Sequence, residues 1–195
     1  MSASQTVVAT RPGNFLLVRD GRPADYPAIR EVVLAAYGQF ASLIPQDVFE
    51  PYLEDLLDLE KHAHNGQWLV VEADGQILGS GAFYPDATVQ GVGWPPGWAS
   101  GRGLAVRPAT RGRGVARALL AASERLAGDG GAPIFAFHTA SFMTGAIALY
   151  EQFGYLRAPD FDYNMAAQYN PSAAPITSIA YVRRLNVTSR PRRIR

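Results

Sequence analysis

Cysteine is absent from the 195-residue chain, which also has only three histidines and one lysine, Lys61. Without cysteine, the protein cannot form a disulfide scaffold, a thiolate zinc site, an iron–sulfur cluster or a thiol nucleophile. Three histidines provide few ligands for any other metal site, so we expect no metal. The nucleophile elbow G-x-S-x-G does not occur either. We therefore expect no covalent enzyme intermediate.

Long apolar runs are missing as well, since none approaches the roughly 20 residues that a membrane-spanning helix needs. Residues 1–14 lack the charged start and apolar stretch of a secretion signal, so we expect a cytoplasmic protein with no membrane partner. Hydrophobic residues make up 48% of the chain and charged residues 18%, which predicts a globular fold. One domain is expected at residues 14–187, between a flexible N-terminus (1–13) and a basic, flexible tail (188–195).

Charge is distributed unevenly along the chain. Six arginines follow residue 182 with no acid, whereas residues 1–182 contain 12 basic and 17 acidic residues, a net charge of −5. The tail could bind nucleic acid, but it contains no aromatic side chains for stacking on bases, and we expect a solvated end. Acidic residues also recur between Asp47 and Glu60 with no base until Lys61. They form either a solvated helix face or a funnel for a cationic substrate.

Apolar periodicity and turn signals predict an α/β protein that mixes hairpins with crossovers. Asp25 is expected to cap the first helix, with Pro27 in its first turn. Asp74-Gly75 predicts a type I′ hairpin turn, and residues 85–101 contain too much proline and glycine for a central strand. The predicted strands are 15–19, 68–73, 77–84, 104–106, 134–139 and 179–185, and the later helices are 46–62, 115–127 and 146–153.

The segment between the strand 104–106 and the helix from Val115 is rich in glycine and arginine. A glycine-rich turn that opens a helix exposes unpaired N–H groups at the positive end of the helix dipole, which suits a phosphate. Gly112 and Gly114 allow an anion to approach the backbone. The segment is neither a G-x-x-x-x-G-K-[S/T] loop nor a G-x-G-x-x-G motif. If the glycines only tightened a turn, Arg111 and Arg113 would be unexplained.

Two motifs together carry a family resemblance. The first is Val106-x-Pro108-x-x-Arg111-Gly112-x-Gly114-x-Ala116, and the second is Ala146-x-x-Leu149-Tyr150-x-x-x-Gly154-Tyr155. The first is similar to the pyrophosphate loop, Q/R-x-x-G-x-G/A, of the GNAT superfamily of acyl-CoA-dependent N-acyltransferases. The second resembles that family's tyrosine-bearing helix followed by Gly-Phe or Gly-Tyr. The order of elements also fits from residue 15 to about 185.

This resemblance implies a fold, an activity and an assembly state. The implied fold is a single-domain α/β structure, with a mixed, mostly antiparallel central sheet, helices on both faces and splayed strands at the acyl-CoA site. The implied enzyme transfers an acetyl group from acetyl-CoA, as co-substrate, to an amine acceptor by direct attack in a ternary complex. The resemblance favours a homodimer over a monomer. The acceptor stays open: an antibiotic, a polyamine, an amino acid or a protein N-terminus.

The same resemblance implies roles for particular residues. Tyr150 would stabilise the departing thiolate, and the strand edge at Leu104, Ala105 and Val106 would pair with the pantetheine amides, with a backbone N–H there polarising the thioester carbonyl. The backbone amides from Arg111 to Ala116 would bind the pyrophosphate, with charge added by two of the arginines; this set comprises Arg111, Gly112, Arg113, Gly114, Val115 and Ala116.

Two departures from the family pattern leave the general base open. The place of the family's frequent glutamate falls near Ser100, and Met143 replaces the usual asparagine before the second signature. His138 is a catalytic candidate because an unperturbed histidine titrates near 6.5, although a packed role is the alternative. Glu72, Asp86 and an amine that arrives neutral are further possibilities. Without a base, the chain could instead be a non-catalytic acyl-CoA-binding regulatory domain.

The loop that contains Trp94 and Trp98 lies where this family builds its acceptor site. Large aromatic side chains on this loop would either form a wall for a hydrophobic acceptor or cover a sheet edge.

Overall fold

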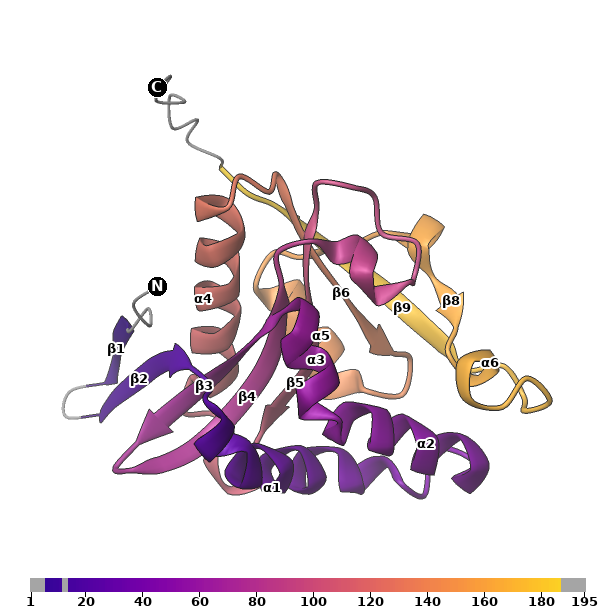
Figure 1. Cartoon of the computed structure of the whole chain (residues 1–195), viewed down its shortest axis with the longest axis horizontal. Helices are drawn as coiled ribbons and strands as arrows, with labels where there is room; N and C mark the ends of the chain where they lie inside the picture. Colours follow the sequence, from indigo (N-terminus) through magenta and orange to yellow (C-terminus); the bar gives the residue numbers. More distant parts are fainter. Residues whose placement is uncertain (1–5, 12–13, 187–195) are drawn as a thin grey trace.

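The computed structural model describes residues 6–11 and 14–186. Within this part of the chain, one nine-stranded sheet runs in the order β1-β2-β3-β4-β5-β6-β9-β7, and β8 also pairs with β9 (Figure 1). All neighbours are antiparallel except β5 and β6. The strands are β1 (Thr6–Arg11), β2 (Asn14–Asp20), β3 (Gln67–Ala73), β4 (Gln76–Tyr84), β5 (Ala99–Val106), β6 (Ile134–Ala140), β7 (Leu156–Arg157), β8 (Tyr163–Asn164) and β9 (Thr177–Arg184).

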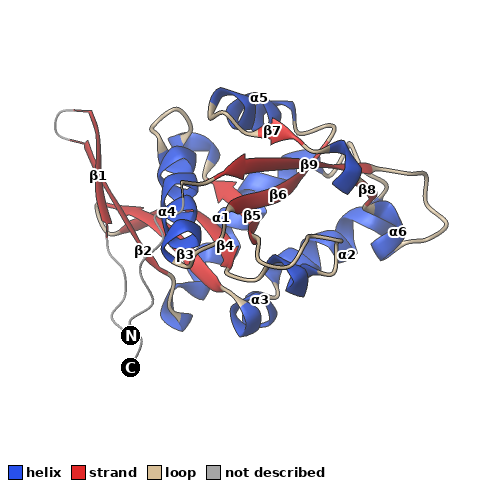
Figure 2. Cartoon of the chain, turned by 90° about the horizontal axis from the view of Figure 1, so that it is seen from above, coloured by secondary structure: helices blue, strands red, loops and turns tan. Residues whose placement is uncertain are grey.

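Helices cover both faces of this sheet, as Figure 2 shows. One buried cluster joins the sheet to α4 and α5, and a second joins it to α1, α2 and α3. The α-helices are α1 (Tyr26–Tyr37), α2 (Gln46–Leu57), α3 (Leu59–Asn65), α4 (Val115–Asp129), α5 (Thr144–Gln152) and α6 (Ala166–Tyr169). None of them is long and apolar enough to cross a membrane.

The apolar run of β3 supplies both clusters because successive side chains on a strand point to opposite faces. Leu69 and Val71 pack in the α4 cluster, whereas Trp68 and Val70 pack in the α1 cluster. Asp74 (φ 51°) and Gly75 (φ 72°) then turn the chain into β4, as predicted for the hairpin. The mixed, mostly antiparallel sheet with helices on both faces confirms the expected fold class.

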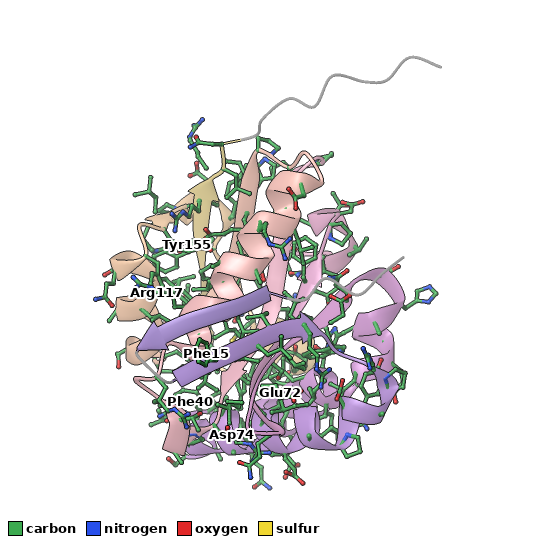
Figure 3. The ribbon with its side chains drawn as sticks, turned by 90° about the vertical axis from the view of Figure 1, so that its left-hand side faces the viewer. Phe15, Phe40, Glu72, Asp74, Arg117 and Tyr155 are labelled. Carbon is green, nitrogen blue, oxygen red and sulfur yellow. The ribbon has the colours of Figure 1, made fainter. Side chains whose placement is uncertain are left out.

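Helix α4 lies very close to the sheet, and Gly79 on β4 permits this approach. A Cβ at Gly79 would lie 2.5 Å from Val115 Cγ1 and 3.0 Å from the Ala105 carbonyl oxygen. Figure 3 shows α4 crossing the sheet, with Arg117 and Tyr155 on the same side of the molecule. The close packing fixes the N-terminal end of α4 against β4 and β5.

The only parallel pair among the described strands is short. Strands β5 and β6 are in register at Ala99↔Phe135 and Ser100↔Ala136, and they then separate. Gly103, at φ 63°, lies where the register between β4 and β5 shifts. A left-handed glycine at a register shift is typical of a β-bulge, which bends its strand. The bulge and the short pairing open the sheet between β5 and β6.

The structure differs from the sequence predictions in several elements. β5 begins at Ala99, inside the predicted loop, and the helix predicted at 46–62 is broken at Asp58 into α2 and α3. Asp25 precedes α1 as predicted, but its carboxylate does not cap that helix; it binds Arg19 at 2.7 Å. Strand β1 lies in a segment for which we expected no strand. The predicted tail, 188–195, lies outside the described residues.

Candidate functional site

A cavity of about 690 Å³ opens where β5 and β6 separate. Its walls come from β5, the loop before α4, the first half of α4, β6 and α5, and α1 and α2 close one side. Most residues predicted from the sequence line it: Leu104, Val106, Arg111, Gly112, Gly114, Val115, Ala116, His138 and Tyr150. Ala105 and Arg113 are not part of the lining. The structure therefore brings both sequence motifs to one cavity.

The N-terminal end of α4 forms one end of this cavity. Gly112 (φ 76°) and Gly114 (φ 85°) adopt left-handed conformations that glycine tolerates. The helical hydrogen bonds begin with the Ala118 N–H, which donates to the Gly114 carbonyl at 2.9 Å. The amides of Val115, Ala116 and Arg117 precede that bond and have no acceptor within the helix. These unpaired donors, together with the helix dipole, make an anion site at this end.

The arginines of the loop take different positions. Arg111 is exposed, and its Nη1 donates to Gln39 Oε1 at 3.3 Å across the cavity mouth. Arg107 instead binds away from the mouth, since its Nε donates to the Ile77 carbonyl and its Nη2 to Glu31. Arg111 is therefore the arginine of the motif that lines the cavity and can add positive charge beside the unpaired amides.

Strand β5 presents a backbone edge to the cavity. Beyond Ser100 it stays paired with β4, and its other edge has no strand partner among the described residues. The Tyr37 hydroxyl donates to the Leu104 carbonyl at 3.3 Å. The side chain of Ala105 is buried in the α1 cluster, so this residue offers its backbone rather than its side chain. An extended ligand with amide groups can pair with this edge as an added strand would.

Tyr150 extends from α5 into the same cavity. Its ring lies 4.0 Å from that of Phe137, centroid to centroid, and its side chain is buried. The hydroxyl has no hydrogen-bond partner among the described residues. Burial raises the pKa of Tyr150 well above its usual value near 10, so the phenol stays protonated at neutral pH. The ring of Tyr150 thus packs in the core, and its hydroxyl is an available hydrogen-bond donor at the cavity wall.

His138 lies on β6 and is held on three sides. Its ring stacks on Trp94 with centroids 4.3 Å apart, it meets the edge of Tyr163, and its Nε2 lies 2.8 Å from the Phe161 carbonyl oxygen. Because a carbonyl only accepts, Nε2 carries the proton, and Nδ1 is the unprotonated nitrogen. Burial lowers the pKa of His138 to about 4. The residue is therefore neutral at pH 7 and a weak base.

No carboxylate occupies the expected base position. Ser100 is fully buried there, and its Oγ accepts a hydrogen bond from Gln90 Nε2 at 3.0 Å. Glu72, on β3, is ion-paired with Arg19 of β2, and Asp86 accepts from the Thr88 amide at the start of a 3-10 turn. Neither of these two carboxylates lines the cavity. Nowhere in residues 6–11 and 14–186 do three or more metal-ligating side chains gather.

Comparison with known proteins now identifies the family. A model of the acetyltransferase (GNAT) family matches residues 29–155. The chain belongs to this family. The matched region runs from α1 to the end of the second motif and includes the loop before α4, β5, β6 and α5.

Solved structures of GNAT proteins share the fold. The PaiA N-acetyltransferase from Thermoplasma acidophilum, in complex with coenzyme A, is 12% identical, with a TM-score of 0.66 over 87% of this chain and 98% of that chain. A GNAT family acetyltransferase from Elizabethkingia anophelis with acetyl-CoA bound is 15% identical, with a TM-score of 0.64 over 87% and 98%.

A third example is the ribosomal-protein-S18-alanine N-acetyltransferase from Escherichia coli, which is 16% identical, with a TM-score of 0.58 over 92% and 99% of the two chains. A search of curated proteins finds no match. At these identities the structures show the fold of this GNAT protein and leave its acceptor open.

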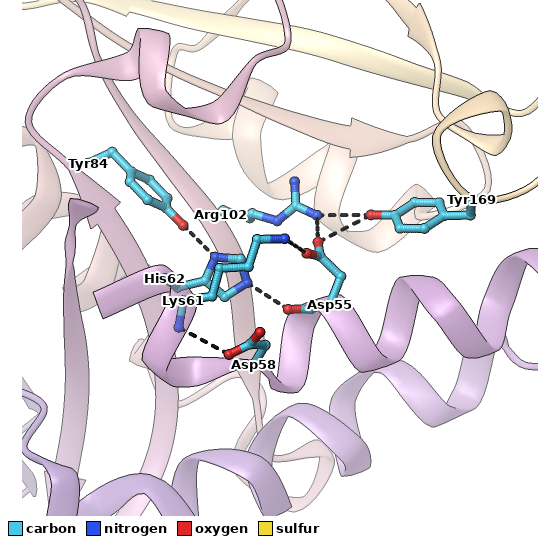
Figure 4. Close-up of polar contacts among 7 residues, drawn as sticks. All are labelled: Asp55, Asp58, Lys61, His62, Tyr84, Arg102 and Tyr169. Carbon is cyan, nitrogen blue, oxygen red and sulfur yellow. Dashed lines mark hydrogen bonds and ion pairs between the residues drawn. The ribbon is translucent and has the colours of Figure 1, made fainter. Parts of the chain in front are cut away.

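Sequence reasoning missed a charged cluster in the GNAT cavity (Figure 4). Arg102, between the predicted loop 85–101 and the predicted strand 104–106, lines the cavity, and its Nη2 donates to the Asp55 carboxylate and, at 3.0 Å, to the Tyr169 hydroxyl. Burial acts to raise the pKa of Asp55, but the charges of Arg102 and Lys61 outweigh it and hold that pKa below its usual value. Asp55 is thus neutralised, which counts against the acidic funnel considered above.

The tryptophan loop packs over the sheet near β6 and β9. Trp94 is buried with Ala87, Ala136 and Ala180, and Trp98 packs beside it at 6.0 Å. Neither tryptophan lines the cavity. The structure therefore favours a covering role over a wall for the acceptor, but the covered strands β6 and β9 lie inside the sheet and not at the predicted edge.

Proposed function

We propose that this GNAT protein is an N-acetyltransferase that transfers the acetyl group of acetyl-CoA to an amine by direct attack in a ternary complex. The observation that carries the proposal is the row of unpaired amides at Val115, Ala116 and Arg117, which opens onto the cavity between β5 and β6. Relatives of the same fold contain coenzyme A or acetyl-CoA, which supports the assignment.

The parts of the cavity suit the parts of acetyl-CoA. The amides of Gly112, Gly114, Val115 and Ala116 bind the pyrophosphate, whereas those of Arg111 and Arg113 donate to the Pro108 and Thr110 carbonyls. The Arg111 side chain adds charge at the mouth. The edge of β5 at Leu104–Val106 pairs with the pantetheine amides and places the thioester beside the gap in the sheet. A backbone N–H of this edge then polarises the thioester carbonyl as the amine attacks.

The acceptor amine and Tyr150 have separate roles in the proposed reaction. The amine nitrogen bonds to the carbonyl carbon, the carbon–sulfur bond breaks, and coenzyme A leaves as a thiolate that the Tyr150 hydroxyl stabilises; the proton that the nitrogen loses as the amide forms ends on that thiolate. His138, the base suggested by the sequence, binds protons too weakly at a pKa of about 4 to deprotonate an ammonium. We infer that the amine enters in its neutral form, with His138 held as part of the wall.

A non-catalytic acyl-CoA-binding domain is the second candidate, because Ser100 and Gln90 occupy the place of the expected carboxylate. Calorimetry with coenzyme A and an acetyl-CoA-dependent thiol-release screen over an amine library distinguish the two. An enzyme binds coenzyme A and releases thiol with some amines. Binding without release by any amine supports the regulatory domain, and no binding at all contradicts both.

A further inference from the structure

The guanidinium of Arg102 is a charged group in the cavity that has no role in the proposed reaction. Its side chain is 19% exposed, and Nη2 alone is hydrogen-bonded, to Asp55 and Tyr169. Nε is buried with no partner, and Nη1 points away from Asp55 in Figure 4. Three of the five N–H donors thus have no acceptor in the described structure. The buried Nε–H is therefore a donor whose desolvation is not compensated until an acceptor pairs with it.

The charge around Arg102 favours a single negative charge as its partner. Asp55 compensates Arg102, and Lys61, which is largely exposed, shares the same carboxylate. His62 hydrogen-bonds the Tyr84 hydroxyl and the Asp55 carbonyl, and burial lowers its pKa, so it adds no charge at pH 7. The residual charge is at most +1, which suits a carboxylate better than a phosphate dianion.

Aromatic rings surround the same end of the cavity. The rings of Tyr37 and Tyr52 are 6.0 Å apart, and those of Tyr52 and Tyr169 are 5.7 Å apart. Arg102 precedes Leu104 by two residues on β5, so their Cα atoms lie at most about 7 Å apart. A group bound at Arg102 is therefore close to the strand edge where the thioester is placed, with apolar walls around it.

The geometry points to Arg102 as the binding site for a carboxylate on the acceptor, so that the acceptor is a small amino acid with an apolar or aromatic side chain. This inference rests on the proposed N-acetyltransferase function. The amine then lies near the thioester, while the carboxylate takes the unpaired guanidinium donors. A cationic polyamine or an internal lysine of a protein lacks this group and would leave the Nε and Nη1 donors of Arg102 without an acceptor.

The test compares each acceptor with a derivative that lacks the charge. Thiol release is measured with phenylalanine, leucine and methionine, with the corresponding amino acid amides, and with the decarboxylated amines. In the wild-type protein, kcat/KM is expected to favour the acid by about 10- to 150-fold, the range for a hydrogen bond to a charged group. In Arg102→Gln this ratio is expected to fall close to one. Because it is a ratio within one protein, a lower fraction of folded enzyme does not change it.

Two further variants distinguish carboxylate binding from a structural role. Asp55→Asn removes the same ion pair from the other side but keeps the guanidinium, so the preference for the acid should persist. Arg30→Gln removes an exposed, ion-paired arginine outside the cavity and should leave the ratio as in wild type.

Equal use of acids and amides by the wild type, or an unchanged ratio in Arg102→Gln, would refute the carboxylate site even though the protein is an acetyltransferase. An equal loss of preference in Asp55→Asn and Arg102→Gln would assign the pair a structural role. If no amine of any kind releases thiol, the proposed function itself fails, and the ratio cannot be formed.

Discussion

Tyr150 is buried and His138 half-buried on the cavity wall, yet removal from water changes their chemistry in opposite ways. Burial disfavours the charged form of each group, so it raises the pKa of the phenol and lowers that of the imidazole. The phenol remains a hydrogen-bond donor across the whole neutral range. The imidazole remains uncharged over the same range and takes up a proton only in acid.

Tyr150→Phe is expected to lower kcat by about 10- to 100-fold and to leave the affinity for acetyl-CoA nearly unchanged, because only the donor to the leaving thiolate is lost. Steady-state kinetics and calorimetry measure the two quantities. Phe153 lies on the same segment and packs under Arg117, so Phe153→Leu serves as a control for packing at α5. Equal kcat in Tyr150→Phe and wild type would return Tyr150 to a purely structural role.

His138→Gln is expected to leave the acidic limb of the pH–rate profile unchanged. A group with a pKa of about 4 is already deprotonated at the pH where the amine titrates. Two acceptors of different basicity should shift the limb by the difference between their pKa values in both proteins. A limb between pH 6 and 7 that stays fixed across acceptors and vanishes in the variant would instead identify His138 as the base.

Among the helices and strands, the sequence predicted the features that depend on a few neighbouring residues. Asp74-Gly75 and the glycines before α4 need particular backbone angles, so their residue types alone predicted the turn and the helix start. The start of β5 was missed because Gly101 and Gly103 resemble loop residues, whereas a bulge accommodates Gly103 within the strand. Arg102 and Asp55 are 47 positions apart, and only the fold brings them together.

Gly114→Val is expected to weaken coenzyme A binding at least tenfold, about 1.4 kcal/mol, because the side chain occupies space beside the unpaired amides. The positive φ of Gly114 also makes the substitution destabilising, by about 1–2 kcal/mol. Gly91→Val is a matched control, since Gly91 also has a positive φ (66°), and an added Cβ would meet nothing within 4 Å. Calorimetry on both proteins should show weak binding in Gly114→Val only; unchanged affinity there would place the cofactor elsewhere.

At the scale of the whole molecule, two neutral histidines couple folding to pH. Burial lowers the pKa of His62 and, to about 4, that of His138. The unfolded chain binds these protons near pH 6.5, before the folded protein does, so their contribution is fully present above that pH and is lost as the pH falls toward 4. Asp25, Asp55 and Asp162, whose carboxylates are paired with arginine, shift stability in the same direction at lower pH.

The free energy of unfolding should therefore decrease as the pH falls from 6 to 4.5, by up to about 1.4 kcal/mol per pH unit for His138, and His62 shifts it in the same direction. Urea denaturation at a series of pH values measures this slope. In His138→Gln, the slope should be smaller by the contribution of His138, because glutamine does not titrate. This holds whatever the effect of the substitution on stability at pH 7. A variant with the slope of the wild type would show that His138 is charged in the folded protein.

Because β5 and β6 pair over a short stretch, a ligand bound between them is expected to affect the thermal stability of the fold. Two residue pairs join these parallel strands. Beyond them, a bound pantetheine arm would supply the hydrogen-bonding partner that the free edge of β5 lacks. A ligand in that gap connects the half of the sheet built before α4 to the half built after it, and it binds only when both halves are folded. Its binding free energy is then added to that of folding, about 2.7 kcal/mol at a hundred times Kd. The melting temperature should therefore rise with the concentration of coenzyme A, and a thermal scan at increasing coenzyme A measures it.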